Sequence, residues 1–412
     1  MNKNIVICDP YNYLLSEELI RRDYKITAVL SSQDILPAYK QFNPNIFTEI
    51  LYYDISNEEC IEKLKELNPI AIFPGCDAGV TICSQLCEKL NLECNPSNTA
   101  MVKRDKYLMS ETLREKNIPA VKQVLVSFKT NIDEAISKIG EFPIIIKPIN
   151  SCSTDGVKFC NCREEVFEAV NKLLNTTNAL NIKNETILMQ EYLGNMEYVV
   201  DFVVLNDTIH TTAIWKYDKV INKDGDVLCY SAELIKSTGE EQDILTEYGK
   251  KVVKALDFKI GPAHCEIILT KRGPILVEVG ARLHGGTAVK YSTICSGKGQ
   301  LEYTIEAYID KEKFIETSKT PYELNKHCKL CFLLYNNSGI LREINYIQEI
   351  KELPSFYKFN SELPVEGKKV KKSKDIINIG AVMTLIHEDE EQLKADYKKL
   401  RNFNDTDLFV IA

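Results

Sequence analysis

The chain lacks any long apolar run. No stretch approaches the ~18–20 apolar residues that a helix needs to cross a bilayer. The first residues, Met1–Cys8, pass directly into a short strand pattern, without the longer apolar stretch and small-residue cleavage site of a secretory signal. We therefore expect a protein with no membrane segment and a cytoplasmic location.

An excess of positive charge is also missing. Lys and Arg number 51 against 59 Asp and Glu, which leaves a formal net charge of -8. Nucleic-acid binding requires a basic surface that neutralises phosphates, so the composition argues against a nucleic-acid partner. We interpret the basic run 367–374 as a solvated turn.

Two kinds of motif are absent, a glycine-rich dinucleotide-binding motif and a set of cysteines with the spacing of a zinc site. No GxGxxG sequence follows the first strand pattern, so a dinucleotide site of the Rossmann type is not expected there. The chain has 14 cysteines, but Cys328 and Cys331 form a lone CxxC without a second pair or a histidine doublet. We expect small buried thiols, with a redox or zinc role as the alternative.

A chain of 412 residues is long enough for two or three domains. In the first ~100 residues, strand patterns alternate with amphipathic helices, which predicts an α/β domain with a doubly wound parallel sheet. The expected strands span 5–8, 25–30, 50–53 and 71–73, and the expected helices span 14–22, 58–66 and 79–90. The segment Pro74–Asp77 follows a strand, where it either lines a ligand crevice or forms a structural turn.

The rest of the chain divides into two further parts. Residues 99–117 read as helical, and 118–190 as a small unit of strands and two helices. The segment Glu197–Val279 is predicted to be mainly strand, and residues after Glu312 form a last α+β unit closed by a helix at 389–400. The predicted domains are 1–98, 99–312 with a lid at about 118–190, and 313–412.

The segment 263–282 is the most informative one, because it reads as a β-hairpin with two carboxylates. If Lys271–Gly273 forms a three-residue loop, Glu266 falls opposite Glu278 with Cβ atoms about 5 Å apart. Like charges so placed are destabilising unless a cation lies between them, and Mg²⁺ or Mn²⁺ with nucleotide phosphates fits that position. The period of two adds Arg282 to the same face. The alternative is a surface hairpin whose glutamates face water.

A lysine at the end of an apolar strand points to an anion. Lys147 ends the run 142–147, where a buried ammonium is costly without an anionic partner such as phosphate. The following loop, 150–157, is rich in small and hydroxyl residues whose backbone N–H groups can approach phosphate oxygens. Such a loop alone is usually a turn.

The segment 187–201 has a strand, a break at Gly194 and a second strand that opens on Glu197. The break exposes backbone groups that an adenine edge can use, and Glu197 can accept hydrogen bonds from ribose hydroxyls. The alternative is a simple hairpin turn with a solvent-facing glutamate.

In this order, the motifs resemble the ATP-grasp superfamily over roughly residues 1–310. The resemblance implies a fold in which two α+β subdomains sandwich ATP, preceded by an N-terminal α/β domain and followed here by the C-terminal α+β unit. It implies ATP and Mg²⁺ (or Mn²⁺) as cofactors, with Glu266 and Glu278 as the metal carboxylates. The implied nucleotide-binding residues are Lys106, Lys147, Ser151, Ser153, Gly156, Val157, Glu191, Tyr192, Leu193 and Glu197.

The chain departs from the family pattern at one place. Many members carry Glu-x-Asn at the second metal position, whereas this chain has Glu278-Val279-Gly280, and glycine has no coordinating side chain. The third ligand is therefore in doubt. His264 is expected across the hairpin from Gly280, where it either reaches the site or is structural.

Within the superfamily, the segment 277–286 and the C-terminal unit resemble the L-amino-acid ligases. This resemblance implies an ATP-dependent carboxylate–amine ligase that joins two amino acids through an acyl phosphate. Lys147 and Arg282 are its expected catalytic residues, with Arg282 holding the acyl phosphate. Two alternatives remain: a carboxylase or purine-pathway ligase of the same fold, and a nucleotide-binding module without turnover.

The substrate residues are expected in two segments. Glu233 is a candidate for an α-ammonium group and Lys236 for a carboxylate, although both also fit exposed charges at a strand end. Arg282, His284 and Gly285 complete the expected substrate site. Small-molecule amino acids are the expected partners, and the family resemblance favours a homodimer.

Overall fold

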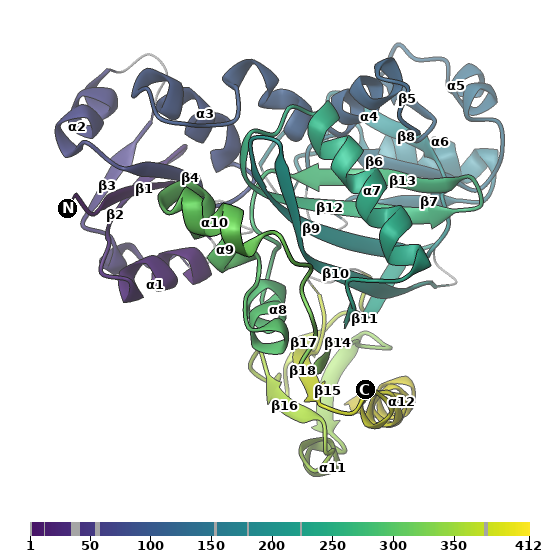
Figure 1. Cartoon of the computed structure of the whole chain (residues 1–412). Coiled ribbons are helices and arrows are strands. Elements are labelled where there is room, and N and C mark those ends of the chain that lie inside the picture. Colours follow the sequence, from purple (N-terminus) through teal and green to yellow (C-terminus); the bar gives the residue numbers. More distant parts are fainter. Residues whose placement is uncertain are drawn as a thin grey trace.

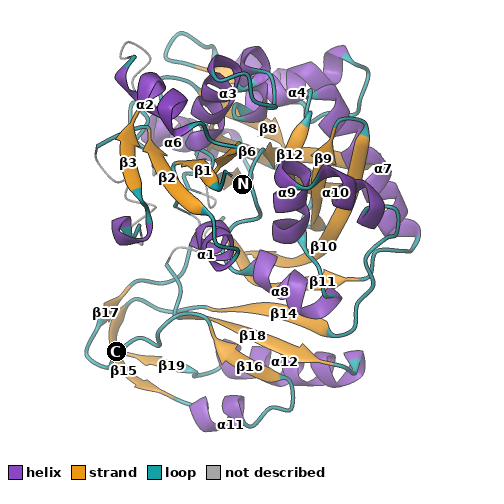
Figure 2. Cartoon of the chain, turned by 60° about the vertical axis from the view of Figure 1, so that its left-hand side comes forward, coloured by secondary structure: helices purple, strands orange, loops and turns teal. Residues whose placement is uncertain are grey.

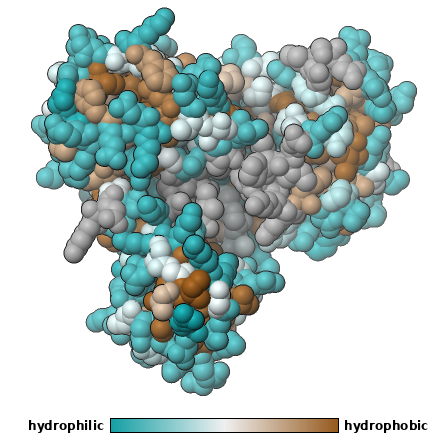
Figure 3. Space-filling view, turned by 180° about the vertical axis from the view of Figure 1, so that it is seen from behind, coloured by the Kyte–Doolittle hydropathy of each residue, from teal (hydrophilic) through white to brown (hydrophobic). Residues whose placement is uncertain are grey.

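The computed structural model describes residues 2–11, 13–33, 42–53, 58–151, 155–178, 181–222, 225–374 and 378–412. Figure 1 shows a purple to blue N-terminal part beside a teal central part, with the yellow C-terminal part below them. The space-filling view shows the same three parts as lobes with largely hydrophilic surfaces (Figure 3). In the described part of the chain, we find no helix with the length and apolar character needed to span a membrane.

The N-terminal part contains a parallel four-stranded sheet in the order β3-β2-β1-β4. Its elements are β1 (Asn4–Cys8), α1 (Tyr13–Arg21), β2 (Lys25–Leu30), a 3-10 turn (Pro44–Ile46), β3 (Glu49–Tyr52), α2 (Glu59–Leu67), β4 (Ala71–Pro74) and α3 (Gly79–Lys89). Helices α2 and α3 bury one face of this sheet, while α1 packs on the other. The predicted doubly wound α/β arrangement is confirmed.

A short linking segment leads to the centre of the molecule. Two 3-10 turns, Ser97–Thr99 and Met101–Lys103, precede helix α4 (Lys106–Glu115). The prediction of a helix from 99 was therefore too long. Helix α4 begins where the side chain of Asp105 accepts a hydrogen bond from the Leu108 N–H, which satisfies one of the free donors at the helix start.

The smaller central sheet is antiparallel, in the order β5-β8-β6-β7. Its elements are β5 (Gln123–Val126), α5 (Ile132–Ile139), β6 (Ile144–Pro148), β7 (Lys158–Cys160), α6 (Arg163–Leu173) and β8 (Ile187–Glu191). The apolar faces of α5 and α6 pack together against this sheet.

The larger sheet has eight strands in the order β13-β12-β9-β10-β11-β14-β18-β16. Its strands are β9 (Glu197–Leu205), β10 (Thr208–Ile221), β11 (Val227–Ile235), β12 (Ile260–Thr270), β13 (Gly273–Gly280), β14 (His327–Leu333), β16 (Phe356–Phe359) and β18 (Ala381–His387). Strands β14, β16 and β18 come from the C-terminal region, so that region continues the central sheet instead of starting a separate one. The predicted domain boundaries stay a prediction.

The remaining elements cover this sheet and its edge. They are α7 (Glu240–Ala255), α8 (Ala288–Ser296), α9 (Gln300–Ile309), α10 (Lys311–Thr317), β15 (Gly339–Ile344), α11 (Ile347–Lys351), β17 (Lys369–Val370), α12 (Glu390–Asp405) and β19 (Phe409–Ile411). At the C-terminal strands, α8 lies on one face and α12 on the other (Figure 2). Strands β15, β17 and β19 form a small separate sheet.

Helix α7 was missed, because its segment was predicted to be mainly strand. Its first turn contains Glu240, Glu241 and Asp243, and Lys254 lies in its last turn, charges that suit the two ends of the helix dipole. Its buried face contains Leu245 and Val252, which are about two helical turns apart, and this spacing is the signal that the sequence offered.

Candidate functional site

A cavity of about 500 Å³ runs between the two central sheets and onto the C-terminal strands. It is lined by most of the predicted site residues: Lys106, Lys147, Ser151, Val157, Glu191, Tyr192, Leu193, Glu197, Glu266, Glu278, Arg282, His284 and Gly285. Gly156 lies beside this lining, with positive φ, in the loop before β7. Ser153 lies outside the described residues.

The hairpin β12–β13 brings the two carboxylates opposite each other as predicted, but by another route. Thr270 pairs with Gly273 across a two-residue turn, so the predicted three-residue loop is wrong. A β-bulge at Val277 adds one residue to β13, and this restores the pairing of Glu266 with Glu278. The shorter turn and the bulge cancel each other, so Glu266 still pairs with Glu278 as predicted.

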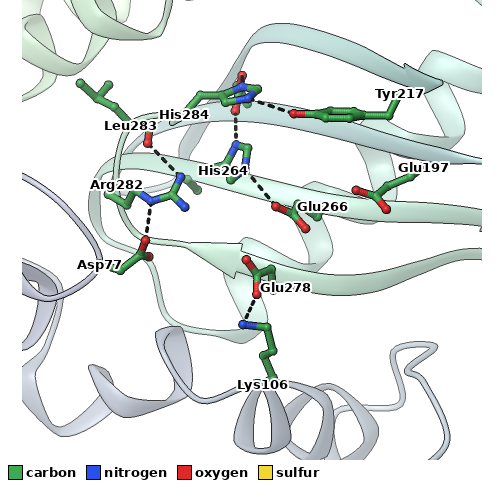
Figure 4. Close-up of polar contacts among 12 residues, drawn as sticks. Asp77, Lys106, Glu197, Tyr217, His264, Glu266, Glu278, Arg282, Leu283 and His284 are labelled. Atoms are coloured by element: carbon green, nitrogen blue, oxygen red, sulfur yellow. Dashed lines mark hydrogen bonds and ion pairs between the residues drawn. The ribbon is translucent and has the colours of Figure 1, made fainter. Parts of the chain in front are cut away.

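Each carboxylate has a cationic neighbour. Lys106 at the start of α4 forms an ion pair with Glu278 (Figure 4). Its Nζ also donates to the Ser151 carbonyl at 3.0 Å. Burial works against the ammonium form of Lys106, but the charge of Glu278 raises the Lys106 pKa above its usual value. Two half-buried carboxylates side by side, with lysines around them, form an oxygen donor set that fits a divalent cation.

Lys147 lies at the end of β6, buried, and faces the same cavity. Burial, together with the charge of Lys106, lowers the pKa of Lys147 to about 8. An ammonium in this position is favoured by an anion that enters the cavity, as expected for a lysine that binds phosphate.

This pKa predicts a pH dependence of nucleotide binding. Below pH 8 the Lys147 ammonium is charged, and above pH 8 it loses its proton, so the affinity of the free enzyme for ADP should fall about fivefold between pH 8 and pH 9. Calorimetric titration at several pH values measures this fall. In Lys147→Arg the guanidinium stays charged, so its affinity should be flat over the same range. A fall of equal size in the variant would rule out Lys147 as the titrating group.

Glu191 and Glu197 lie at opposite sides of the break between β8 and β9. The Glu191 side chain accepts from the Lys122 N–H at 2.8 Å and pairs with Arg272 at 2.7 Å, so it fixes the connection between the sheets. Glu197 is buried and pairs with Lys219 of β10, which also lines the cavity. Lys219 was missed, since one lysine in a long strand carries no motif.

Two histidines share one buried carboxylate beside Glu266 (Figure 4). Asp201 of β9 contacts His264 Nδ1 at 3.0 Å through Oδ1 and His284 Nδ1 at 2.8 Å through Oδ2. His264 Nε2 lies 3.4 Å from Glu266, and His284 Nε2 lies 3.3 Å from the Tyr217 hydroxyl. In the described part of the chain, Asp201, His264 and His284 are also the one group of three side chains close enough together to hold a metal ion.

The protonation states explain this cluster without a metal. Although burial disfavours charge, Asp201 and Glu266 raise the pKa of His264 to about 9, so its ring donates to both carboxylates. Burial lowers the pKa of His284, so its neutral ring donates to Asp201 and accepts from Tyr217. The cluster thus orients Glu266. The predicted position of His264 opposite Gly280 is confirmed.

Arg282 has a partner from the N-terminal part of the chain. Its Nε donates to Asp77 Oδ2 at 2.8 Å, and its guanidinium also donates to the Leu283 carbonyl at 3.0 Å. Asp77 ends the segment Pro74–Asp77, so this segment contacts the site through Arg282, although none of its residues is among those that line the cavity. A Cβ on Gly280 would lie 3.3 Å from both Asp77 Oδ1 and Arg282 Cζ. The space of the missing asparagine is therefore filled by the Arg282–Asp77 pair.

Glu233 and Lys236 are not brought into the cavity. Ala232 lines the cavity, so the alternation along β11 turns Glu233 to the opposite face, where it pairs with Lys329 at 2.8 Å. Lys236 follows the end of β11 and is exposed. Glu233 and Lys236 therefore lie outside the cavity in which they were predicted to bind substrate.

The site and fold have clear relatives among known proteins. The ATP-grasp domain model matches residues 140–290. The dapdiamide A synthase of Enterobacter agglomerans is 25% identical over 284 residues, which is 69% of this chain and 67% of that protein.

Two solved structures show the same fold over nearly the whole chain. The L-amino acid ligase from Bacillus licheniformis superposes with a TM-score of 0.75 at 18% identity, over 100% of this chain and 98% of the other. The N5-carboxyaminoimidazole synthetase from Staphylococcus aureus, in complex with ADP, gives a TM-score of 0.67 at 18% identity, over 97% and 98% of the two chains.

Residues 140–290 therefore match an ATP-grasp domain, and the whole chain has the fold of ATP-grasp enzymes, which use ATP. More narrowly, it is an ATP-grasp ligase of the carboxylate–amine class.

Proposed function

We propose that this protein joins two amino acids through an amide bond at the expense of ATP. The γ-phosphoryl group passes to a carboxylate oxygen of one amino acid, which gives ADP and an acyl phosphate. The amine of the second amino acid attacks the acyl carbon, phosphate leaves with the C–O bonding pair, and the nitrogen loses a proton. The observation that carries the proposal is a single cavity. It contains the lysines Lys106 and Lys147, the paired carboxylates and Arg282, and it continues into an uncharged end.

The chain's own residues supply the electrostatics of phosphoryl transfer. Lys147 and Lys106 face the cavity from two different elements, so their charges converge on the phosphates. Glu266 and Glu278 would hold Mg²⁺ or Mn²⁺, which supplies further neutralisation of phosphate charge when bound. Glu197, which pairs with Lys219, would accept hydrogen bonds from the ribose hydroxyls.

Arg282 suits the second step of the reaction. Asp77 and the Leu283 carbonyl occupy two of its N–H groups, so the other donors of the planar guanidinium remain for the acyl phosphate. As the amine attacks, negative charge grows on the acyl oxygen, and a fixed cation beside it lowers that barrier.

The nature of the cavity favours amino acids over a ribonucleotide substrate. Among the described lining residues, the lysines and Arg282 gather around the paired carboxylates, and the lining from β11, β14 and β18 is uncharged. A ribonucleotide phosphate at that end would lack a cationic partner. The purine-pathway alternative therefore has less support from the site.

The test is ADP release from ATP and Mg²⁺ with pairs of the common amino acids, compared with each amino acid alone. We expect release that requires a pair, with a product mass equal to the two amino acids minus water. Turnover that depends on bicarbonate or formate would support the carboxylase or purine-pathway alternative instead. ATP binding without turnover in every mixture would leave a nucleotide-binding module. The homodimer and the cytoplasmic location stay predictions.

A further inference from the structure

One end of the cavity is built from uncharged side chains, and we call it the apolar chamber. Its residues come from strands β10, β11, β14 and β18, and none of them was predicted as a site residue. They are Tyr217, Cys229, Ala232, Leu330, Phe332 and Val382. The chamber is continuous with the part of the cavity that contains Arg282 and His284.

The register of the sheet places the chamber on the same face as the paired carboxylates. Glu266 of β12 pairs with Val199 of β9, and Val199 pairs with Trp215 of β10. Directly paired residues point to the same face of an antiparallel sheet, and so do residues two apart on one strand. Tyr217 therefore shares the face of Glu266.

The same face continues across the C-terminal strands. Tyr217 pairs with Ala232 of β11, and Ala232 pairs with Leu330 of β14. Phe332, two residues further along β14, pairs with Val382 of β18. The chamber is thus a row of uncharged side chains on the sheet that also carries the reacting groups.

Lys219 of β10 borders the chamber, with its Nζ 5.2 Å from the centroid of the Tyr217 ring, but it already forms an ion pair with Glu197. The charged residues of β11 and β14 lie elsewhere. Lys329 and Glu233 pair on the opposite face of the sheet, where the Lys329 Nζ also lies 4.1 Å from the centroid of the Tyr397 ring. The nearby polar lining residue Asn360 is already paired, because its Nδ2 donates to Thr384 Oγ1 at 2.7 Å and its Oδ1 accepts from the Tyr291 hydroxyl. A charged group in the chamber would lose its hydration without gaining an ionic partner.

We propose that the apolar chamber binds the side chain of one of the two joined amino acids, so that this substrate has an uncharged, apolar side chain. The proposal rests on the proposed ligase function. Ala232 sets the size of the chamber, because it is the smallest side chain of the row and lies between Tyr217 and Leu330. A larger residue at 232 would fill space that the substrate side chain needs.

The first arm of the test compares side chains at a fixed partner amino acid. We expect kcat/KM for leucine, methionine or phenylalanine to exceed that for aspartate or lysine by about 100-fold or more, since a charged group there would be unpaired. Equal or higher kcat/KM for the charged amino acids would overturn the proposal.

The second arm uses Ala232→Leu. We expect kcat/KM for the largest apolar substrate to fall about 10- to 100-fold, while that for alanine or glycine and the KM for ATP change little. Phe332→Ala, which removes volume and avoids overpacking, should shift the preference towards larger side chains. Cys331→Ala, on the opposite face of β14, is the matched control and should leave the preference unchanged.

The outcomes separate the two proposals. If no amino-acid pair gives ADP and a condensed product, the ligase proposal fails. If products form but Ala232→Leu slows all amino acids by one factor, with ATP binding intact, only the chamber proposal fails, because the effect is then not one of side-chain size.

Discussion

Glu278→Gln is expected to lower kcat on the order of 10³-fold, the largest effect of any single substitution proposed. The carboxylate opposite Glu266 is half of the proposed donor pair for the divalent cation, and an amide has nearly the same shape but no charge. The loss should appear in kcat with ATP and amino acids at saturation. Mn²⁺ binding in the presence of ADP, followed by electron paramagnetic resonance, should weaken in parallel, and this is a readout that does not need turnover.

The control for this variant addresses folding. Glu278 forms an ion pair with Lys106, so the substitution leaves a lysine with the Ser151 carbonyl as its main partner, and some loss of stability is expected. The melting temperature should show a folded protein nonetheless, since glutamine keeps an oxygen acceptor. Glu316→Gln, an exposed glutamate of α10, should behave as wild type. A folded Glu278→Gln enzyme with kcat within threefold of wild type would remove Glu278 from the metal site.

The hairpin shows what the sequence could predict and why. Glu266 pairs with Glu278 whenever three residues of β13 and the turn are left unpaired between them, whether all three form the turn or two form the turn and one forms a bulge. The shorter turn and the bulge at Val277 together keep that number at three. The same reasoning correctly placed His264 opposite Gly280, although the details of the turn were wrong.

Contacts between distant segments were beyond such reasoning. Asp77 and Arg282 are 205 residues apart, and no local pattern indicates that the loop after β4 fills the space beside Gly280. Asp201 could have been found from the sequence, because it lies four residues after Glu197 on the same strand and therefore on the same face of the sheet. The apolar chamber required the knowledge that β14 and β18 join the central sheet, which depends on tertiary pairing.

The second large effect is expected for Arg282→Lys, whose kcat should fall about 100-fold with little change in the KM for ATP. The guanidinium donates to Asp77 and the Leu283 carbonyl and still has N–H groups for the acyl phosphate. A lysine ammonium is a single centre on a flexible stem and cannot hold Asp77 and the reacting group in one plane. Single-turnover kinetics should show the loss in the condensation step, with ADP formation less affected.

Asp77→Asn separates the position of Arg282 from its charge. The amide oxygen can still accept from Arg282 Nε, but the N-terminal carboxylate that fixes the guanidinium is neutralised, so a loss of about tenfold in kcat is expected, smaller than that of Arg282→Lys. Asp77→Glu, which keeps the charge, should recover part of the rate. If Arg282→Lys keeps nearly the full rate of condensation, the guanidinium does not hold the acyl phosphate. The N-terminal part of the chain would then contribute to the architecture of the site but not to its chemistry.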